Sequence, residues 1–294
     1  MAISFVLASV LAYLFWAVSN LFCRFVMTRE RRSIISYMFI LSVECALSLL
    51  ILLFIPLHNL SWQLVCFGIG AGLIGYLGIV PYLKAIQVEE VSRLIPLWLL
   101  TPLFVLIFTS IFGEKLTGQQ YFAFVLIMLG GLILVLKEVR TFTLSKALPF
   151  MLAAAFFGAV QVLVADELFK YVTFWDGFML GRIGLASFAL CVVLVPRWRK
   201  EAFSFVNKQK KISSYIFSGE LISSLAAGFY FYAISVGVAA LVSALQGLES
   251  IFVFVLSLGV SFLFPKILHE DLSLPSILSK GGAIILMVAG TLLL

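Results

Sequence analysis

Charged residues are scarce in this chain: they make up 12% of its 294 residues, whereas about a quarter is usual for soluble proteins. Apolar residues make up 63%, and the mean hydropathy is +1.17. So little charge excludes a soluble enzyme, a nucleic-acid-binding protein and a disordered chain. The apolar runs are continuous and do not alternate with polar residues, which also excludes a closed outer-membrane barrel. The composition therefore predicts an all-α integral membrane protein.

Residues that build most catalytic and metal sites are also few. The two histidines, His58 and His269, fall in predicted loops, and no two of the four cysteines form a CxxC pair. The sequence has no lysine-bearing phosphate loop, so it carries no ATP motor of its own. The apolar runs also lack the clustered Asp, His or Cys that a membrane-embedded enzyme needs. We therefore expect no enzymatic activity, no cofactor and no bound metal.

Glycine is frequent in two apolar runs, where its role is expected to be structural. Residues 70–75 match the GxGxxG dinucleotide fingerprint literally, but they lack the strand, turn and helix that this motif requires. Small residues at helical spacing instead allow two membrane helices to approach closely. The glycines expected on such close-packing faces are Gly68, Gly72, Gly75 and Gly78 in one run and Gly177, Gly181 and Gly184 in the other.

Ten apolar stretches are long enough to be transmembrane helices, each of which needs about 20 residues. The predicted helices span residues 2–26, 33–57, 62–83, 91–112, 121–136, 147–168, 174–195, 213–234, 238–264 and 276–294. The first stretch has no basic residue before it and no small-residue cleavage site after it, so we expect a retained helix and not a signal peptide. The longest connection, 196–212, is predicted to be a loop.

The basic residues lie almost entirely on one side of the predicted membrane. Only Lys115 and Lys170 fall in loops that follow even-numbered helices, and Arg182 and Lys280 fall within helices. The other Lys and Arg residues follow odd-numbered helices. Because basic loops stay in the cytoplasm, we predict a multi-pass protein of the cell (inner) membrane with both termini outside the cytoplasm. The pI of about 9.2 then reflects topology and attraction to anionic membrane lipids, and no nucleic-acid partner is expected.

The two halves of the chain contain similar segments in the same order. An odd number of spans in each half makes the second half enter the membrane from the opposite face. We therefore predict two inverted five-helix repeats, residues 1–140 and 141–294, with a binding site between them near the membrane midplane. The shared apolar composition of membrane segments is an alternative source of the similarity. The matching segments are 82–88 with 230–236, 104–105 with 252–253, 15–18 with 157–160, and 113–116 with 269–272.

Several of these segments resemble those of the EamA-type transporters of the drug/metabolite transporter superfamily. They are Phe-Trp-Ala-Val at 15–18, Tyr-x-x-Ala-Ile at 82–86, Gly-Glu-Lys-Leu at 113–116, and the pair Gly130 and Gly131 in the fifth helix. The resemblance implies ten helices as two five-helix repeats, and a central cavity lined by helices one to four and six to nine. Helices five and ten are then peripheral, and a homodimer would form through them. It also implies transport of small metabolites, including amino acids, often as export. Such transporters are usually drawn with both termini in the cytoplasm, opposite to the charge distribution here, so the direction of transport stays open.

Four ionisable residues fall within the predicted helices: Glu44, Arg182, Glu220 and Glu249. Each costs about 3 kcal/mol at the centre of a membrane, so we expect them to face the interior of the bundle. Arg182 could bind a substrate carboxylate while Glu44 or Glu249 binds an ammonium group. Alternatively, Glu44 and Arg182 form a purely structural ion pair. Glu220 could instead lie at the cytoplasmic end of its helix, in contact with water.

Further polar and aromatic residues are candidates for substrate contact. Ser243, Gln246, Glu249 and Ser250 have the spacing of one helical face, and the repeat aligns Gln246 with Trp98 and Glu249 with Thr101. Pro96 and Pro102 each free a backbone carbonyl in the fourth helix, which is tolerated beside a cavity. The complete set of predicted substrate-binding residues is Trp16, Asn20, Glu44, Tyr82, Trp98, Gln161, Arg182, Tyr230, Gln246 and Glu249.

Together these patterns predict a secondary active transporter, an exporter or exchanger, that works by alternating access. Its small-molecule substrate is best described as an amino acid or related zwitterion. The energy source would be the substrate gradient, exchange, or a proton taken up by Glu249 or Glu44, since a buried carboxylate can hold a proton. A flippase for a lipid-linked substrate is an alternative, and it would require a lateral opening in the bundle.

The predicted orientation can be tested with a tag placed after Leu294. We expect a membrane-impermeant reagent to label this tag from outside intact cells, because the basic loops hold the opposite side of the protein in the cytoplasm. A tag inserted within 196–212 is the control and should react only after the cells are opened. Labelling of the C-terminal tag only in opened cells would contradict the orientation.

Overall fold

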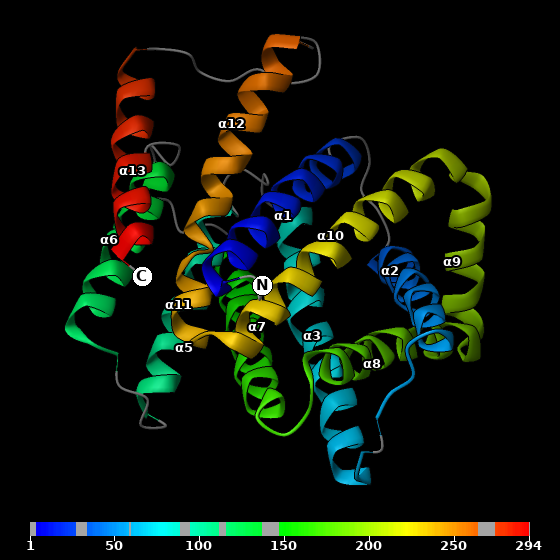
Figure 1. The fold of residues 1–294 in the computed structure, drawn as a ribbon. Coiled ribbons are helices and arrows are strands. Elements are labelled where there is room, and N and C mark those ends of the chain that lie inside the picture. Colours follow the sequence, from blue (N-terminus) through cyan, green and yellow to red (C-terminus); the bar gives the residue numbers. More distant parts are fainter. Residues whose placement is uncertain are drawn as a thin grey trace.

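The computed structural model describes residues 4–27, 34–58, 60–88, 95–111, 116–136, 147–263 and 274–293. These residues form helices joined by turns and contain no β-strand (Figure 1). Helices are expected in an apolar environment, because each helix satisfies its own backbone hydrogen bonds. The predicted repeat boundary at 140–141, the segments 113–115 and 269–272, and His269 lie outside the described residues.

Helices occupy all ten of the predicted apolar stretches. By length and composition, five are candidate membrane spans: Ile34–Leu53, Trp62–Val88, Leu148–Phe169, Phe174–Leu194 and Lys210–Val236. The all-helical membrane class is therefore confirmed for the described residues. The elements are α1 (Phe5–Met27), α2 (Ile34–Ser48), η1 (Leu49–Leu53), α3 (Trp62–Val88), η2 (Ile95–Leu99), α5 (Leu100–Ile111), α6 (Gly118–Leu136), α7 (Leu148–Phe169), α8 (Phe174–Leu194), α9 (Pro196–Lys208), α10 (Lys210–Val236), α11 (Ala239–Ala244), α12 (Gly247–Leu263) and α13 (Leu274–Leu293).

The prediction of a loop at 196–212 is wrong, because α9 occupies most of it. Pro196 stands at the start of this helix, where its missing N–H costs nothing. Apolar residues at helical spacing then form one face, on which Ala202 is buried and the Trp198 ring lies 6.0 Å from Phe188 of α8. The abundance of basic residues concealed this pattern. In Figure 1, α9 runs crosswise to α8 at the edge of the molecule.

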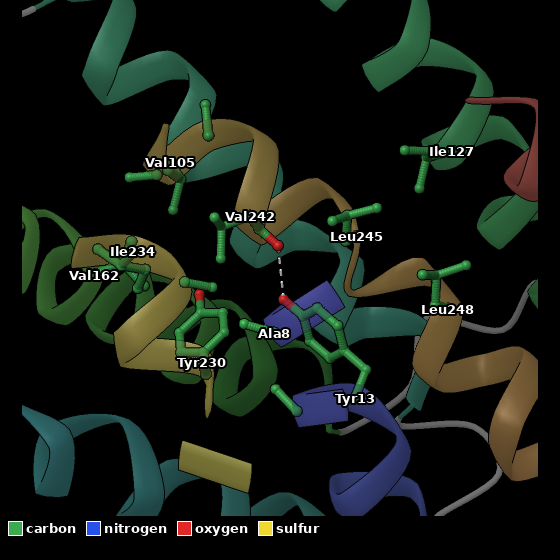
Figure 2. Close-up of a cluster of buried hydrophobic side chains, with 14 of the residues drawn as sticks. Ala8, Tyr13, Val105, Ile127, Val162, Tyr230, Ile234, Val242, Leu245 and Leu248 are labelled. Atoms are coloured by element: carbon green, nitrogen blue, oxygen red, sulfur yellow. Dashed lines mark hydrogen bonds between the residues drawn. The ribbon is translucent and has the colours of Figure 1, made fainter. Parts of the chain in front are cut away.

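The predicted helix 238–264 is also not continuous, since α11 and α12 are separated at residues 245–246. The amide of Gln246 bonds to Ser243 O at 3.0 Å, three residues back and not four. This tighter turn frees the carbonyl of Val242, which accepts a hydrogen bond of 3.0 Å from the Tyr13 hydroxyl (Figure 2). The predicted polar stripe therefore crosses a helix break and does not lie on one regular helical face.

A similar break divides the predicted helix 91–112 into η2 and α5. Pro102 lies in the first turn of α5, where a residue without an N–H is tolerated. A regular helix through this point would need the missing donor and would place the proline ring against the preceding turn. Pro102 is thus accommodated by its place in the first turn of α5, whereas the expectation that its freed carbonyl lies beside a cavity stays a prediction.

The start of α8 is held by a buried network around Asp176. Thr173 caps the helix by accepting a hydrogen bond of 3.2 Å from the Asp176 amide, and its hydroxyl lies 2.6 Å from Asp176 Oδ2. The backbone N and the Nδ1 of His58 lie 3.1 Å and 2.9 Å from the same carboxyl group. This network ties the segment before α3 to the start of α8.

Helices pack in pairs that recur between the first and second halves of the chain. α1 packs on α10 and α12, as α7 packs on α3 and α5. α2 packs on α8, and α6 on α13. Figure 1 shows α6 and α13 side by side at one edge and α1 alongside α10. A homodimer through α6 and α13 stays a prediction.

The largest apolar cluster lies where the helices of the two halves meet. It joins Ala8 and Tyr13 of α1, Val105 of α5 and Ile234 of α10 with the residues around the break between α11 and α12 (Figure 2). Tyr13 is 1% exposed, so its hydroxyl needs an internal partner. The freed Val242 carbonyl supplies this partner, and the core thereby stabilises the broken helix.

The expected close packing of glycine-bearing helices is confirmed between α3 and α8. A Cβ on Gly72 would lie 2.1 Å from the backbone O of Gly181, and one on Gly184 would lie 2.2 Å from the backbone O of Ile69. Both contacts are with backbone, which cannot rotate away. The two helices therefore touch through their main chains.

We predict that Gly72→Ala destabilises the protein by about 1–3 kcal/mol, because the added methyl group overpacks a backbone contact. A lower thermal unfolding midpoint of the purified protein measures this. Gly70→Ala is the matched control on the same helix, since nothing lies within 4 Å of its Cβ position. Equal midpoints for the two variants would contradict the close packing of α3 on α8.

Candidate functional site

A cavity of about 310 Å³ lies within the helix bundle. Its walls come from α1, α2, α3, η2, α5, α7, α8, α10 and α12, together with Gln246 at the break before α12. Within the described part of the chain, α6 and α13 contribute nothing to the lining, in agreement with the peripheral position expected for the fifth and tenth helices. The cavity is thus enclosed by elements of both halves.

The structure brings all ten predicted site residues to this one cavity. Their gathering follows from the cost of exposing polar groups to an apolar surrounding, whereas their contact with a substrate stays a prediction. The ten lining residues are Trp16, Asn20, Glu44, Tyr82, Trp98, Gln161, Arg182, Tyr230, Gln246 and Glu249.

Glu44 and Arg182 form the buried ion pair that the sequence analysis left as an alternative. Arg182 Nη2 lies 2.7 Å from Glu44 Oε2, and the two side chains are 6% and 1% exposed. Ser224 Oγ accepts a hydrogen bond from Arg182 Nη1 at 2.7 Å and donates one to the same Glu44 oxygen at 2.8 Å. Arg182 Nε donates to Ser48 at 3.0 Å. Hydrogen bonds that satisfy both charges make a buried pair of this kind tolerable.

Glu249 lies apart from this pair, in the first turn of α12. Its Oε1 accepts a hydrogen bond from the side-chain amide of Asn20 on α1. Trp16, one turn before Asn20, donates from Nε1 to Ser223 Oγ of α10 at 3.3 Å. The face of α1 that carries Trp16 and Asn20 therefore connects α10 to the broken helix.

Aromatic rings cover the cavity on this side. The ring of Trp16 lies 5.6 Å from Tyr13 and 5.1 Å from Tyr230, and the two tyrosine rings are 5.9 Å apart. A second pair, Tyr82 and Trp98, has ring centroids 5.0 Å apart. Such rings offer apolar surface and a negative face that attracts cations.

Glu220 faces the interior of the bundle as expected, but the predicted set of substrate-binding residues leaves it out, together with several other lining residues. The proposed position at a wetted helix end is wrong, since Glu220 is 8% exposed and lines the cavity. Its Oε1 accepts a hydrogen bond from the Tyr37 hydroxyl. Glu220, Ser223, Ala227 and Tyr230 are spaced as one face of α10, and this periodicity could have identified the residue.

Thr101 is another lining residue with a specific property. It is 6% exposed, and its Oγ1 has no hydrogen-bond partner among the described residues. A buried hydroxyl without a partner is costly, and its position in the cavity wall leaves it available to a bound molecule. Within the same described residues, no three His, Cys, Asp or Glu side chains are placed to hold a metal ion.

Comparison with known proteins supports the resemblance that the sequence suggested. Residues 3–136 match the model of the EamA-like transporter family, so the resemblance to this type of drug/metabolite transporter is confirmed. No curated protein matches the chain significantly. Among solved structures 27 chains match. One is a crystal structure of a protein that shares 16% identity over 98% of this chain and 95% of that chain, with a TM-score of 0.67. This similarity shows the fold alone.

We predict that Glu44→Gln destabilises the protein by about 3–5 kcal/mol, because it leaves the Arg182 charge buried without its partner. The thermal unfolding midpoint should fall accordingly, and the double variant Glu44→Gln/Arg182→Gln should recover much of the loss. Glu167→Gln is the control, since its pair with Lys170 is exposed and its loss should leave the midpoint unchanged. A double variant no more stable than Glu44→Gln would contradict this coupling.

Proposed function

We propose that this protein, whose residues 3–136 match the EamA-like transporter family, is a secondary carrier of the drug/metabolite transporter type for a small metabolite that bears an ammonium group. The sequence predicts amino acids and related zwitterions as the class. The observation that carries the proposal is the single cavity that collects every predicted polar site residue from both halves of the chain. Its volume of about 310 Å³ is at the lower end of the range for small-molecule sites.

Helix packing supports the arrangement of ten membrane helices as two inverted repeats, residues 1–140 and 141–294. A two-fold relation between the halves would exchange α1 with α7, α3 with α10, and α5 with α12. Under this exchange the packed pair α1–α10 corresponds to α7–α3, and the packed pair α1–α12 corresponds to α7–α5. The same relation maps α2–α8 and α6–α13 onto themselves. Such matched pairs are expected when two similar five-helix units enter the membrane from opposite faces.

The two helix breaks give further support to the repeat. Trp98 precedes the first break and aligns with Gln246 at the second, while Thr101 and Glu249 follow in the first turns of α5 and α12. All four residues line the cavity. Discontinuous helices at the contact between repeats are typical of carrier binding sites. Rocking of the two halves about these breaks would open the cavity alternately to each side.

Charge distribution supports an orientation with both termini outside the cytoplasm. Basic residues of α9 and of the first turn of α10 are exposed on one end of the bundle. We assign this end to the cytoplasmic side of the inner membrane, where Lys and Arg also meet anionic lipid headgroups. The exposed basic residues are Arg197, Arg199, Lys200, Lys208, Lys210 and Lys211.

Counterflow into liposomes that contain the purified protein tests the transport function. We expect exchange of radiolabelled amino acids or amines and no exchange of nucleosides or sugars, because only ammonium-bearing solutes match the acidic cavity. Gly158→Leu should reduce counterflow to the level of protein-free liposomes. A Cβ on Gly158 would make ordinary contacts with Thr101 at 3.6 Å, so the larger side chain extends into the cavity.

Gly70→Leu is the matched control, because the Cβ position of Gly70 faces open space. It should retain full counterflow. Failure of every solute class to exchange, or equal counterflow by the Gly158 and Gly70 variants, would contradict a carrier that works through this cavity.

A further inference from the structure

The lining of the cavity contains more acids than bases. Glu44, Glu220 and Glu249 line it, whereas Arg182 is the one base among the lining residues whose side chains the structure describes. Arg182 is already paired with Glu44 at 2.7 Å. The described lining therefore retains two carboxyl groups, Glu220 and Glu249, that no cation neutralises.

The partners of these two acids are neutral. Glu249 accepts from the amide of Asn20, and Glu220 accepts from the hydroxyl of Tyr37. A single neutral hydrogen bond does not compensate a buried carboxylate, which is stable only when paired or more completely solvated. Both acids are 8% exposed, so without a ligand each is stable when it holds a proton, and a cationic ligand is the group that can compensate its charged form.

Conversely, the described lining offers a carboxylate no free cation, only neutral donors such as the side-chain amides of Gln161 and Gln246. All three nitrogens of the Arg182 guanidinium already donate hydrogen bonds: Nη1 to Ser224, Nη2 to Glu44 and Nε to Ser48. The amides at the start of α12 are also occupied, since Leu248 N bonds to Leu245 O at 2.9 Å and Glu249 N to Gln246 O at 3.0 Å. A carboxylate in this cavity would face two acids without a free cation.

Aromatic rings and a free hydroxyl complete the surroundings of a ligand. Trp16 precedes Asn20 by one helical turn and packs on Tyr13 and Tyr230, so an aromatic cluster lies beside the residue that bonds Glu249. Rings of this kind bind both ammonium groups and apolar ligand surface. The Thr101 Oγ1, buried without a partner in the described residues, can bond a polar group elsewhere on the same ligand.

From this arrangement, and resting on the proposed carrier function, we infer that the cavity selects cationic amines with an apolar or aromatic body over the corresponding amino acids. Glu249, whose partner Asn20 follows Trp16 by one helical turn, binds the ammonium group, Glu220 adds a second negative charge to the same lining, and the Tyr13, Trp16 and Tyr230 rings cover the apolar body. Because Glu44 neutralises the Arg182 guanidinium, this cation is not free to bind the carboxylate of a zwitterion. Amines without a carboxylate thus take the place of the zwitterions that the sequence predicts as the preferred substrates.

Three probes with the same phenol ring separate the effects of charge. Liposomes containing the protein and preloaded with tyramine take up radiolabelled tyramine by counterflow, and competition is measured with tyramine, tyrosine and 3-(4-hydroxyphenyl)propionate. We expect tyramine to compete at least about tenfold better than tyrosine, which corresponds to about 1.4 kcal/mol. The carboxylate without an amine should not compete.

Variants connect this preference to the two acids. Glu249→Gln and Glu220→Gln should each reduce the factor by which tyramine competes better than tyrosine. If a variant no longer transports, the same ratio is measured from the equilibrium binding of the two compounds to the purified protein. Glu167→Gln should leave the ratio unchanged, since Glu167 is exposed and lies outside the cavity lining. The ratio is used because a general loss of folded protein lowers the binding of both compounds by the same factor and leaves their ratio unchanged.

The possible outcomes distinguish this inference from the carrier function. Tyrosine competing as well as tyramine, or a ratio that both glutamine variants leave unchanged, would overturn amine selectivity while a carrier for amino acids still stands. Absence of binding and counterflow by all three probes would also overturn the inference. The carrier function itself is tested separately, by the wider solute panel and by the comparison of Gly158→Leu with Gly70→Leu.

Discussion

The ion pair between Glu44 and Arg182 is the interaction on which the rest of the site depends. It joins α2 to α8, and through Ser224 it reaches α10. In an apolar bundle neither charge is stable alone, so these helices must meet at one place. The pair also removes the charge of the one described base in the cavity wall. Glu220 and Glu249 are thereby left to determine which ligand charge the cavity accepts.

The helix breaks and the close contact of α3 with α8 shape the space around this pair. Residues 245–246 interrupt the predicted ninth helix and place Gln246 and Glu249 at the cavity. Tyr13 satisfies the carbonyl that the break leaves free. Gly72 and Gly184 bring two backbones into contact, which draws Arg182 towards the centre of the bundle. Irregular backbone in the interior is thus stabilised by specific partners on neighbouring helices.

Much of the site could be predicted because polar residues in an apolar chain are rare and costly. This reasoning identified Glu44, Arg182 and Glu249, and the cavity indeed collects them. It expected Glu220 to face inward as well, but failed to include this residue in the site, because a position near the end of a predicted helix allowed contact with water as an equal explanation. It also failed for α9, because a short amphipathic helix rich in basic residues has a loop-like composition. In both cases the missing information was which helix packs opposite the residue.

The amino-acid sequence by itself determined the membrane class, the approximate helix ranges and the set of polar residues that must turn inward. These properties depend on composition and local periodicity, which are local in the chain. Tertiary structure decided that Arg182 pairs with Glu44, that Asn20 meets Glu249, and that one long helix breaks at the cavity. The partners in these contacts lie more than a hundred residues apart, so their pairing is set by helix packing and not by local sequence.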